Sequence, residues 1–234
     1  MKLVILTGAG ISAESGMPTF RDASGLWTHF DLNYVCTASA LRENPETVLE
    51  FHNLLRRSIA NAHPNAAHLT IADLEKEYDV TVITQNIDNL HERAGSTNVI
   101  HIYGDATKAT SSTHRLNPDC IIDYPLDKPI CVGDKSTDGS QLRPAVLLMD
   151  EYPFDLSLAE KACKSADVFL VIGTSFSIRS AASLASGVRI DVPRYMIEPS
   201  DSPSEGYIHI KKKATEGIVV FVNCLKQIDP NIRR

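Results

Sequence analysis

Two polar segments of this sequence each follow a short apolar run, and both contain residue types suited to a phosphorylated ligand. The first segment, TGAGISAESGMPTFRD, occupies residues 7–22 and contains Gly8 and Gly10. Glycines at this spacing permit a tight turn and a close approach to a pyrophosphate, which the N-terminus of a following helix would attract. An ordinary strand-to-helix turn explains the Gly-x-Gly pattern equally well. The dipeptide Phe20-Arg21 adds a guanidinium of the kind that pairs with phosphate.

The second segment, TQNIDNLHERAGS at residues 84–96, directly follows the apolar run DVTVIT. It places Gln85, Asn86 and Asp88 just past a strand end, where a doubly wound sheet binds its ligands. An alternative reading makes Asp88 the cap of a short helix that stops at Gly95. The sequence leaves both readings of Asp88 open.

Together these segments, followed by NVIH, closely resemble the sirtuins, which are NAD-dependent protein lysine deacylases, and especially their compact bacterial type. The tripeptides GLW at 25–27 and GTS at 173–175 and the tetrapeptide QLRP at 141–144 match in order and spacing. The resemblance therefore spans nearly the whole chain. It implies NAD as the cofactor and an acylated protein lysine, or another acceptor of ADP-ribose, as the partner.

The resemblance also implies which residues bind NAD. These residues would shape a pyrophosphate turn, form a cofactor loop, line the pocket for nicotinamide and its ribose, and contact the adenosine half. The pyrophosphate turn would contain Gly8, Ala9, Gly10 and Glu14, and the cofactor loop would contain Phe20 and Arg21. The nicotinamide and ribose pocket would contain Gln85, Asn86 and Asp88, and the adenosine contacts would come from Gly173, Thr174 and Ser175.

The segment TNVIHIYGDATKA departs from the family at Tyr103, which stands where the resemblance implies a histidine. In the family reaction, the acyl-lysine oxygen attacks the ribose as nicotinamide leaves, and that histidine is the general base that completes formation of O-acyl-ADP-ribose. A tyrosine with a pKa near 10 is ionised in only about one molecule in a thousand at neutral pH, so it is a poor base. His101 is expected on the same face of the strand, about 6–7 Å away, as a packing or hydrogen-bonding residue. We therefore take Asn86, Asp88 and Tyr103 as the catalytic positions and expect impaired deacylation.

Three functions are consistent with these residues. The first is NAD-dependent lysine deacylation, weakened by Tyr103. The second is cleavage of NAD with a different acceptor, as in an ADP-ribosyltransferase or an NAD hydrolase, which Asn86 and Asp88 could support without a histidine base. The third is a catalytically inactive module that binds NAD or ADP-ribose. The acyl group, the protein target and the oligomeric state are not indicated by the sequence.

The residues expected around the acyl-lysine and the adenosine also differ from the family pattern. In RPAVLLMDEYP, residues 143–153, Ala145, Met149 and Asp150 replace the usual histidine, phenylalanine and glycine. That stretch normally pairs with the peptide as an added strand, so an ordinary acetyl-lysine peptide is less well supported. Met196 replaces an asparagine that usually meets the adenosine ribose.

Most sirtuins hold a structural zinc with two Cys-x-x-Cys pairs, and this chain has no such pair in the corresponding insert. Residues 105–142 contain Cys120, Cys131 and His114 at irregular spacing. A tetrahedral structural zinc needs four such ligands, so we predict no metal.

The elements that must position these residues follow an alternating pattern. Short, nearly continuous apolar runs alternate with amphipathic stretches of helical length, which predicts an α/β fold with a Rossmann-like, doubly wound parallel sheet. Continuous apolarity is typical of strands that are buried on both faces. The expected strands are 2–6, 79–84, 98–103, 145–149 and 167–173, and the expected helices are 46–61, 66–77, 154–165, 177–186 and 215–228.

Two segments leave this alternation and return to it, which predicts a single sirtuin-like domain with two lobes. The large Rossmann lobe is expected to contain approximately residues 1–27, 66–104 and 143–234. The insertions, approximately residues 28–65 and 105–142, are expected to form a smaller lobe over the ligand crevice.

The composition excludes several other classes of protein. The 234 residues have a net charge of −6, so no basic excess exists to neutralise nucleic-acid phosphates. No run approaches 18 apolar residues, which argues against a membrane partner. The five widely spaced cysteines and the lack of a signal-peptide pattern predict a cytoplasmic protein.

Overall fold

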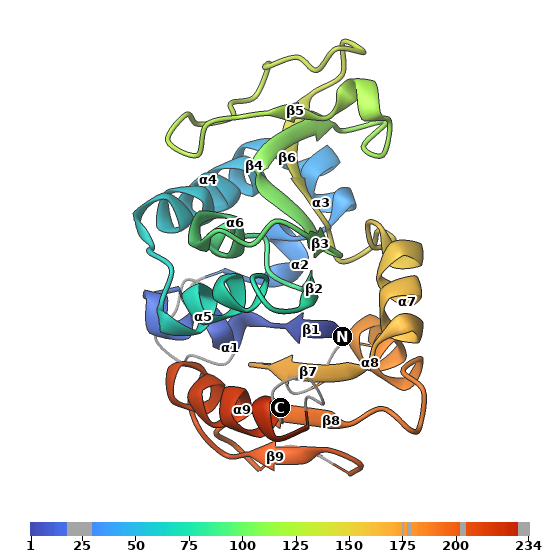
Figure 1. The fold of residues 1–234 in the computed structure, drawn as a ribbon. Helices are drawn as coiled ribbons and strands as arrows, with labels where there is room; N and C mark the ends of the chain where they lie inside the picture. The colour runs from blue at the N-terminus through green and yellow to red at the C-terminus, as the bar shows by residue number, and fades with distance from the viewer. Residues whose placement is uncertain (18–29, 175, 177–178, 202–204, 229–234) are drawn as a thin grey trace.

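The computed structural model describes residues 1–17, 30–174, 176, 179–201 and 205–228. Within these ranges, six parallel strands form one sheet in the order β3-β2-β1-β7-β8-β9. This arrangement confirms the expected Rossmann-like α/β fold (Figure 1). The strands are β1 (Lys2–Thr7), β2 (Asp79–Thr84), β3 (Val99–His101), β7 (Val168–Ile172), β8 (Arg194–Ile197) and β9 (Ile208–Ile210).

Helices cover both faces of this sheet, which explains why its strands are continuously apolar. On one face Leu3 and Ile5 belong to a core that includes residues of α5 and α9. On the other face Val4 and Leu6 pack in a core with residues of α7 and α8. The covering helices are α5 (Ala66–Leu74), α7 (Leu156–Ser165), α8 (Arg179–Ser186) and α9 (Ala214–Ile228). The short helices beside the strand ends are α1 (Ala9–Ser12), η1 (Ala13–Ser15) and α6 (Leu90–Ala94).

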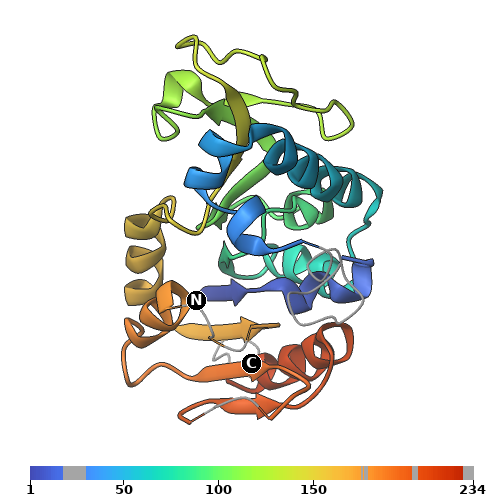
Figure 2. The ribbon, with the colours of Figure 1, turned by 180° about the vertical axis from the view of Figure 1, so that it is seen from behind.

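A second, antiparallel sheet lies above the parallel sheet in Figure 1. Its strands have the order β5-β4-β6, and helices α2, α3 and α4 lie on the same side of the molecule, as the opposite view shows (Figure 2). We call these six elements the small lobe. They are α2 (Leu32–Val35), α3 (Ala38–Glu43), α4 (Pro45–Asn61), β4 (Gly104–Ser111), β5 (Ile122–Asp123) and β6 (Leu142–Val146), and a 3-10 turn, η3 (Pro118–Cys120), connects β4 to β5.

The apolar run at residues 145–149 is not a strand of the parallel sheet, contrary to the interpretation from the sequence. Its first two residues end β6, which pairs antiparallel with β4. All residues of β6 are buried, as they are in the parallel strands, because α3 and α4 pack against the small sheet. Continuous apolarity therefore reports burial on both faces, and it does not distinguish parallel from antiparallel pairing.

The buried guanidinium of Arg56 connects α4 to the rest of the small lobe. Arg56 is 1% exposed, and it donates to the carbonyl oxygens of Ala106 at 3.1 Å, Lys128 at 2.7 Å and Tyr124 at 3.2 Å. It also donates to the carbonyl of Pro125. Burial lowers the pKa of Arg56, and these carbonyl groups compensate the charge by hydrogen bonding.

Replacing Arg56 by methionine should lower the free energy of unfolding by about 3 kcal/mol or more, because several buried carbonyls would lose their donor. The matched control is Arg57→Met on the same helix, where the side chain is exposed and the change should stay within about 0.5 kcal/mol. Urea denaturation of both variants measures the difference. Equal losses for the two variants would contradict this role of Arg56.

Three histidines are buried in the described core and are held neutral there. Burial lowers the pKa of His52 to about 4 and that of His68 to about 4. The pKa of His91 also lies well below its ordinary value, chiefly because of burial. His52 keeps its proton on Nδ1, which donates to the Val48 carbonyl oxygen at 2.8 Å.

A histidine whose pKa is lower in the folded state takes up its proton first in the unfolded chain. The free energy of unfolding should therefore fall as the pH is lowered from 6.5 toward about 4. Urea denaturation at a series of pH values measures this slope, and His52→Gln should make it shallower. His63→Gln, at an exposed position, serves as the control and should leave the slope unchanged.

Candidate functional site

The polar segments singled out in the sequence meet at the carboxyl ends of the central strands. The backbone N–H of Gln85 donates to the carbonyl of Thr7 at 2.9 Å, which joins the ends of β1 and β2. The N–H of Gly8 donates to the carbonyl of Ile172 at 3.0 Å, which joins the ends of β1 and β7. The structure thus brings together the glycine turn, the segment after β2 and the turn at Gly173.

The glycines at the end of β1 are required by a close contact between two turns. A β carbon at Gly8 would lie 2.7 Å from the β carbon of Thr174, and one at Gly10 would lie 2.6 Å from the α carbon of Gly173. Gly173 itself has a φ of 66°, in the left-handed region that favours glycine. The absence of a β carbon at Gly8 and Gly10 thus lets the turn after β1 pack against Thr174 and Gly173, and their approach to a pyrophosphate stays a prediction.

Gly10→Ala should lower the free energy of unfolding by about 1–3 kcal/mol, because the two turns would have to separate. Gly187→Ala is the matched control, since its β carbon would meet the Leu184 carbonyl at 3.3 Å and the Ser183 carbonyl at 3.8 Å. The control should cost less than about 1 kcal/mol. Thermal or urea denaturation distinguishes the two, and a Gly10→Ala protein as stable as the control would contradict the contact.

Asn86, Ser12 and Asp88 form a buried chain of hydrogen bonds beside the glycine turn. The amide Nδ2 of Asn86 donates to the carbonyl of Gly8 at 3.2 Å and to Ser12 Oγ at 3.1 Å. Ser12 Oγ in turn donates to Asp88 Oδ2 at 3.0 Å. Each of the three residues is less than a tenth exposed. Ser12 was missed in the sequence because nothing about a serine two residues after a glycine indicates a partner in a segment more than 70 residues away.

Asp88 accepts a hydrogen bond at the start of α6, as the capping interpretation predicted, and its role toward a ligand stays a prediction. Its Oδ2 faces Ser12, while its Oδ1 accepts from the backbone N–H of Leu90 at 3.1 Å, at the start of α6. Burial raises the pKa of the Asp88 carboxyl, and the hydrogen bonds from Leu90 and Ser12 act in the opposite direction. The carboxyl is therefore positioned by α6 and also available to the polar chain.

Tyr103 lies at the same end of the sheet, but its hydroxyl is engaged by a neighbouring helix. The phenol oxygen lies 2.6 Å from Ser180 Oγ on α8, and the ring packs against the core beneath α7 and α8. Burial raises the pKa of Tyr103 above its ordinary value, and the bond to Ser180 only partly opposes this shift. A phenol in this environment stays protonated at neutral pH and cannot act as a general base there.

His101 and Tyr103 do not share a face, which corrects the expectation of strand alternation. The strand β3 ends at His101, and residues 102 and 103 form a turn. His101 faces α6, where its Nε2 lies 2.8 Å from Glu92 Oε1, whereas Tyr103 faces α8. Because alternation applies only within a strand, the turn redirects the Tyr103 side chain.

The other residues that the sirtuin resemblance implies for NAD binding lie in different parts of the structure. Glu14 faces α9, where its carboxylate accepts from the backbone N–H of Thr215 at 3.0 Å and from its hydroxyl at 2.9 Å. Ala9 begins α1, and Thr174 lies against Gly8. The remaining three implied residues, Phe20, Arg21 and Ser175, lie outside the described residues.

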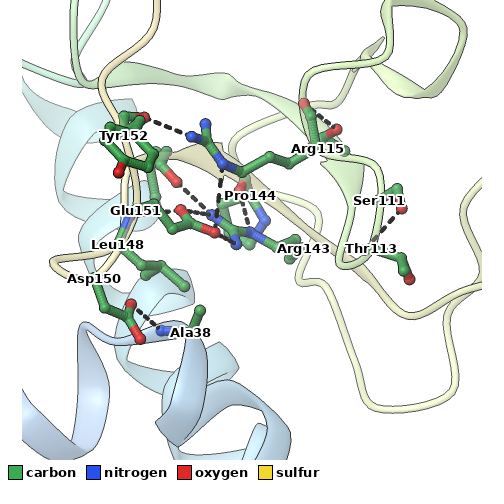
Figure 3. A network of polar contacts seen from close by, with 12 residues as sticks. Ala38, Ser111, Thr113, Arg115, Arg143, Pro144, Leu148, Asp150, Glu151 and Tyr152 are labelled. Carbon is green, nitrogen blue, oxygen red and sulfur yellow. Dashed lines mark hydrogen bonds and ion pairs between the residues drawn. The ribbon is translucent and has the colours of Figure 1, made fainter.

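The segment after β6 is anchored by charged groups rather than left open (Figure 3). Arg143, 2% exposed, donates to Glu151 through Nη1 at 2.7 Å and through Nη2 at 3.0 Å. Arg115 lies 3.5 Å from the same carboxylate. Asp150 accepts from the backbone N–H of Ala38 at 2.6 Å and so caps α3. Asp150, which departs from the family pattern, thus has a structural partner in this chain.

The residues considered as metal ligands have separate hydrogen-bond partners. Cys120 Sγ accepts from Thr137 at 3.4 Å, and His114 Nδ1 lies 2.9 Å from Asp138 Oδ2. No group of three or more histidine, cysteine, aspartate or glutamate side chains suited to a metal ion occurs within the described part of the chain. In the same part of the chain, no helix has the length and apolarity needed to cross a membrane.

Comparison with known proteins places this arrangement in a family. The model of the Sir2 family matches residues 8–180. The NAD-dependent protein deacylase of Bacteroides thetaiotaomicron is 42% identical over 220 residues, covering 92% of this chain and 94% of the relative. The NAD-dependent protein deacylase of Aggregatibacter actinomycetemcomitans is 44% identical over 204 residues, covering 87% and 95% of the two chains.

A solved structure of a Sir2 homologue in complex with NAD superimposes with a TM-score of 0.85 at 34% identity, covering 97% of this chain and 90% of that chain. The protein belongs to the Sir2 family, and the sirtuin resemblance of its motifs is thereby confirmed.

Proposed function

We propose that this protein binds NAD at the carboxyl ends of β1, β2 and β7 and catalyses NAD-dependent deacylation of protein lysines, with a slow step at Tyr103. The buried chain of Asn86, Ser12 and Asp88 beside the glycine turn is the observation that carries the proposal. Relatives with 42% and 44% identity are named NAD-dependent protein deacylases, which supports the same reaction here. NAD supplies the ADP-ribose group that accepts the acyl group as nicotinamide leaves.

The residues present fit such a cofactor because the polar groups at the strand ends are oriented before it binds. Asn86 Nδ2 is committed to Gly8 and Ser12, so the amide is fixed in orientation and its oxygen would meet the ligand. Asp88 is held by Ser12 and by the N-terminus of α6, so it would present a fixed carboxyl to the ribose. Preorganised polar groups of this kind lower the cost of binding and of charge development.

Tyr103 determines which half of the reaction is slow. Its hydroxyl is held by Ser180, and burial raises its pKa, so the phenol cannot take a proton from a ribose hydroxyl. That proton would leave to solvent without a positioned base. We therefore propose that the release of nicotinamide is retained and that the later acyl transfer is slow.

The partner in this proposal is an acylated lysine peptide, presented beside the segment after β6. Met149 and Tyr152 of that segment are 62% and 86% exposed, while Asp150 is tied to α3. We further infer a cytoplasmic location, which the five free cysteines support.

Tyr103→His should raise the rate of peptide deacetylation by about 100-fold or more, because a positioned general base contributes that much. Asn86→Ala should abolish release of nicotinamide. The measurement follows the release of nicotinamide from NAD, with and without an acetyl-lysine peptide, and the formation of deacetylated peptide when that peptide is present. The control is Tyr34→His, which makes the same change at an exposed position on α2.

The other two functions give different results in this experiment. Nicotinamide release that needs no peptide and is lost in Asn86→Ala would identify an ADP-ribosyltransferase or an NAD hydrolase. Retained NAD binding with no turnover in any variant would identify a binding module. Either result would reject deacylation.

A further inference from the structure

We propose that His101 is a positioning residue whose doubly protonated imidazole holds the backbone carbonyl of Asn86 and thereby fixes the segment 85–88 for NAD. This inference rests on the proposed function for its catalytic meaning. His101 contacts the backbone carbonyl of Asn86, so it would act on the cofactor through that backbone.

The position of His101 between two oxygen acceptors is the basis of the inference. Its Nδ1 lies 3.1 Å from the carbonyl oxygen of Asn86, and its Nε2 lies 2.8 Å from Glu92 Oε1. The imidazole is 12% exposed, so protein groups rather than water satisfy it. One ring thus connects the segment after β2 to helix α6.

Only the imidazolium can satisfy both acceptors. A neutral histidine carries one N–H, and its other nitrogen is an acceptor. If the proton were on Nδ1, the lone pair of Nε2 would face the Glu92 carboxylate. If the proton were on Nε2, the lone pair of Nδ1 would face the Asn86 carbonyl. Either neutral form therefore replaces one attraction with a repulsion.

The charged groups around His101 favour the protonated form. Burial by itself lowers the pKa of His101, but the hydrogen bond and charge of Glu92 on α6 raise it, together with the charge of Asp105 on β4. The Asn86 carbonyl adds to this effect, and the net shift is upward. Asp88 interacts favourably with the same imidazolium, whereas His91 on α6 is kept neutral partly by it.

The bond to Asn86 completes the set of contacts that hold this part of the backbone. Thr84 Oγ1 accepts from the N–H of Asn86 at 3.0 Å, and the N–H of Ala106 donates to the carbonyl of Ile87 at 2.9 Å. His101 supplies the donor for the carbonyl between these two groups. If His101 lost its Nδ1 proton, the peptide unit at the Asn86 carbonyl would be free to rotate. That rotation would move the side-chain amide of Asn86 as well.

The test combines NMR of the free protein with NAD binding and turnover across pH. In the wild type, ¹⁵N spectra should show protons on both ring nitrogens of His101 at pH 6.5, and the backbone amide of Ile87 should shift as His101 deprotonates. NAD affinity by calorimetry should fall at least threefold as the pH rises through the pKa of His101 in the folded protein, since positioning is present below that pKa and lost above it.

Two variants and one control make the test specific. Glu92→Gln keeps an acceptor but removes the charge, so it should move the loss of NAD affinity to lower pH. His101→Gln should remove that pH dependence and lower kcat for nicotinamide release about tenfold at pH 6.5. His114→Gln removes another imidazole that pairs with a carboxylate, at 2.9 Å in the small lobe, and should behave as the wild type.

Failure of the inference differs from failure of the proposed function. A wild type that neither binds NAD nor releases nicotinamide rejects the proposed function. In that case the ring protons of His101 and the backbone amide of Ile87 still test whether His101 holds the Asn86 carbonyl. A neutral His101 at pH 6.5, or a Glu92→Gln profile identical to the wild type, overturns the inference. If His101→Gln does not fold, the Glu92→Gln profile decides.

Discussion

The close contact between the turn at Gly8 and Gly10 and the turn at Gly173 is the constraint on which the candidate site depends. The N–H of Gly10 donates to the carbonyl of Gly173 at 2.9 Å, and neither turn has room for a β carbon opposite the other. The same turn leads into α1, whose Ser12 reaches both Asn86 and Asp88 in the segment after β2. The close glycine contact and the buried polar chain thus share the turn after β1.

The small lobe is held in a different way, by buried guanidinium groups bound to oxygen. Arg56 donates to backbone carbonyls and ties α4 to β4 and to the loop after β5. Arg143 is paired with Glu151, which also accepts from the N–H of Leu148 and so shapes the segment after β6. Hydrogen bonds to charged groups are stronger than neutral ones, and they hold this lobe where the hydrophobic core is small.

His101 at the end of β3 and Tyr103 in the turn after it have opposite consequences for the chemistry. His101 faces α6 and supports the backbone of Asn86, whereas Tyr103 faces α8 and is bound to Ser180. The part of the site that would hold NAD is therefore preorganised. The part that would accept a proton is occupied by a phenol that burial keeps neutral. Under the proposed function, this chain would combine a preorganised cofactor half with an altered acyl-transfer half.

The sequence by itself determined the fold class and the family, because these depend on local apolar runs and on motifs whose residues are contiguous. It also predicted that Tyr103 stands where the resemblance implies a histidine. It predicted that Asn86 and Asp88 lie at a strand end. Only the tertiary structure decided that Ser12 is the partner of Asn86 and Asp88, and that Ser180 is the partner of Tyr103. It also decided that β6 belongs to the small sheet and that His101 faces away from Tyr103. These facts depend on contacts between segments far apart in the chain, and no local pattern of residue types encodes which of them will meet.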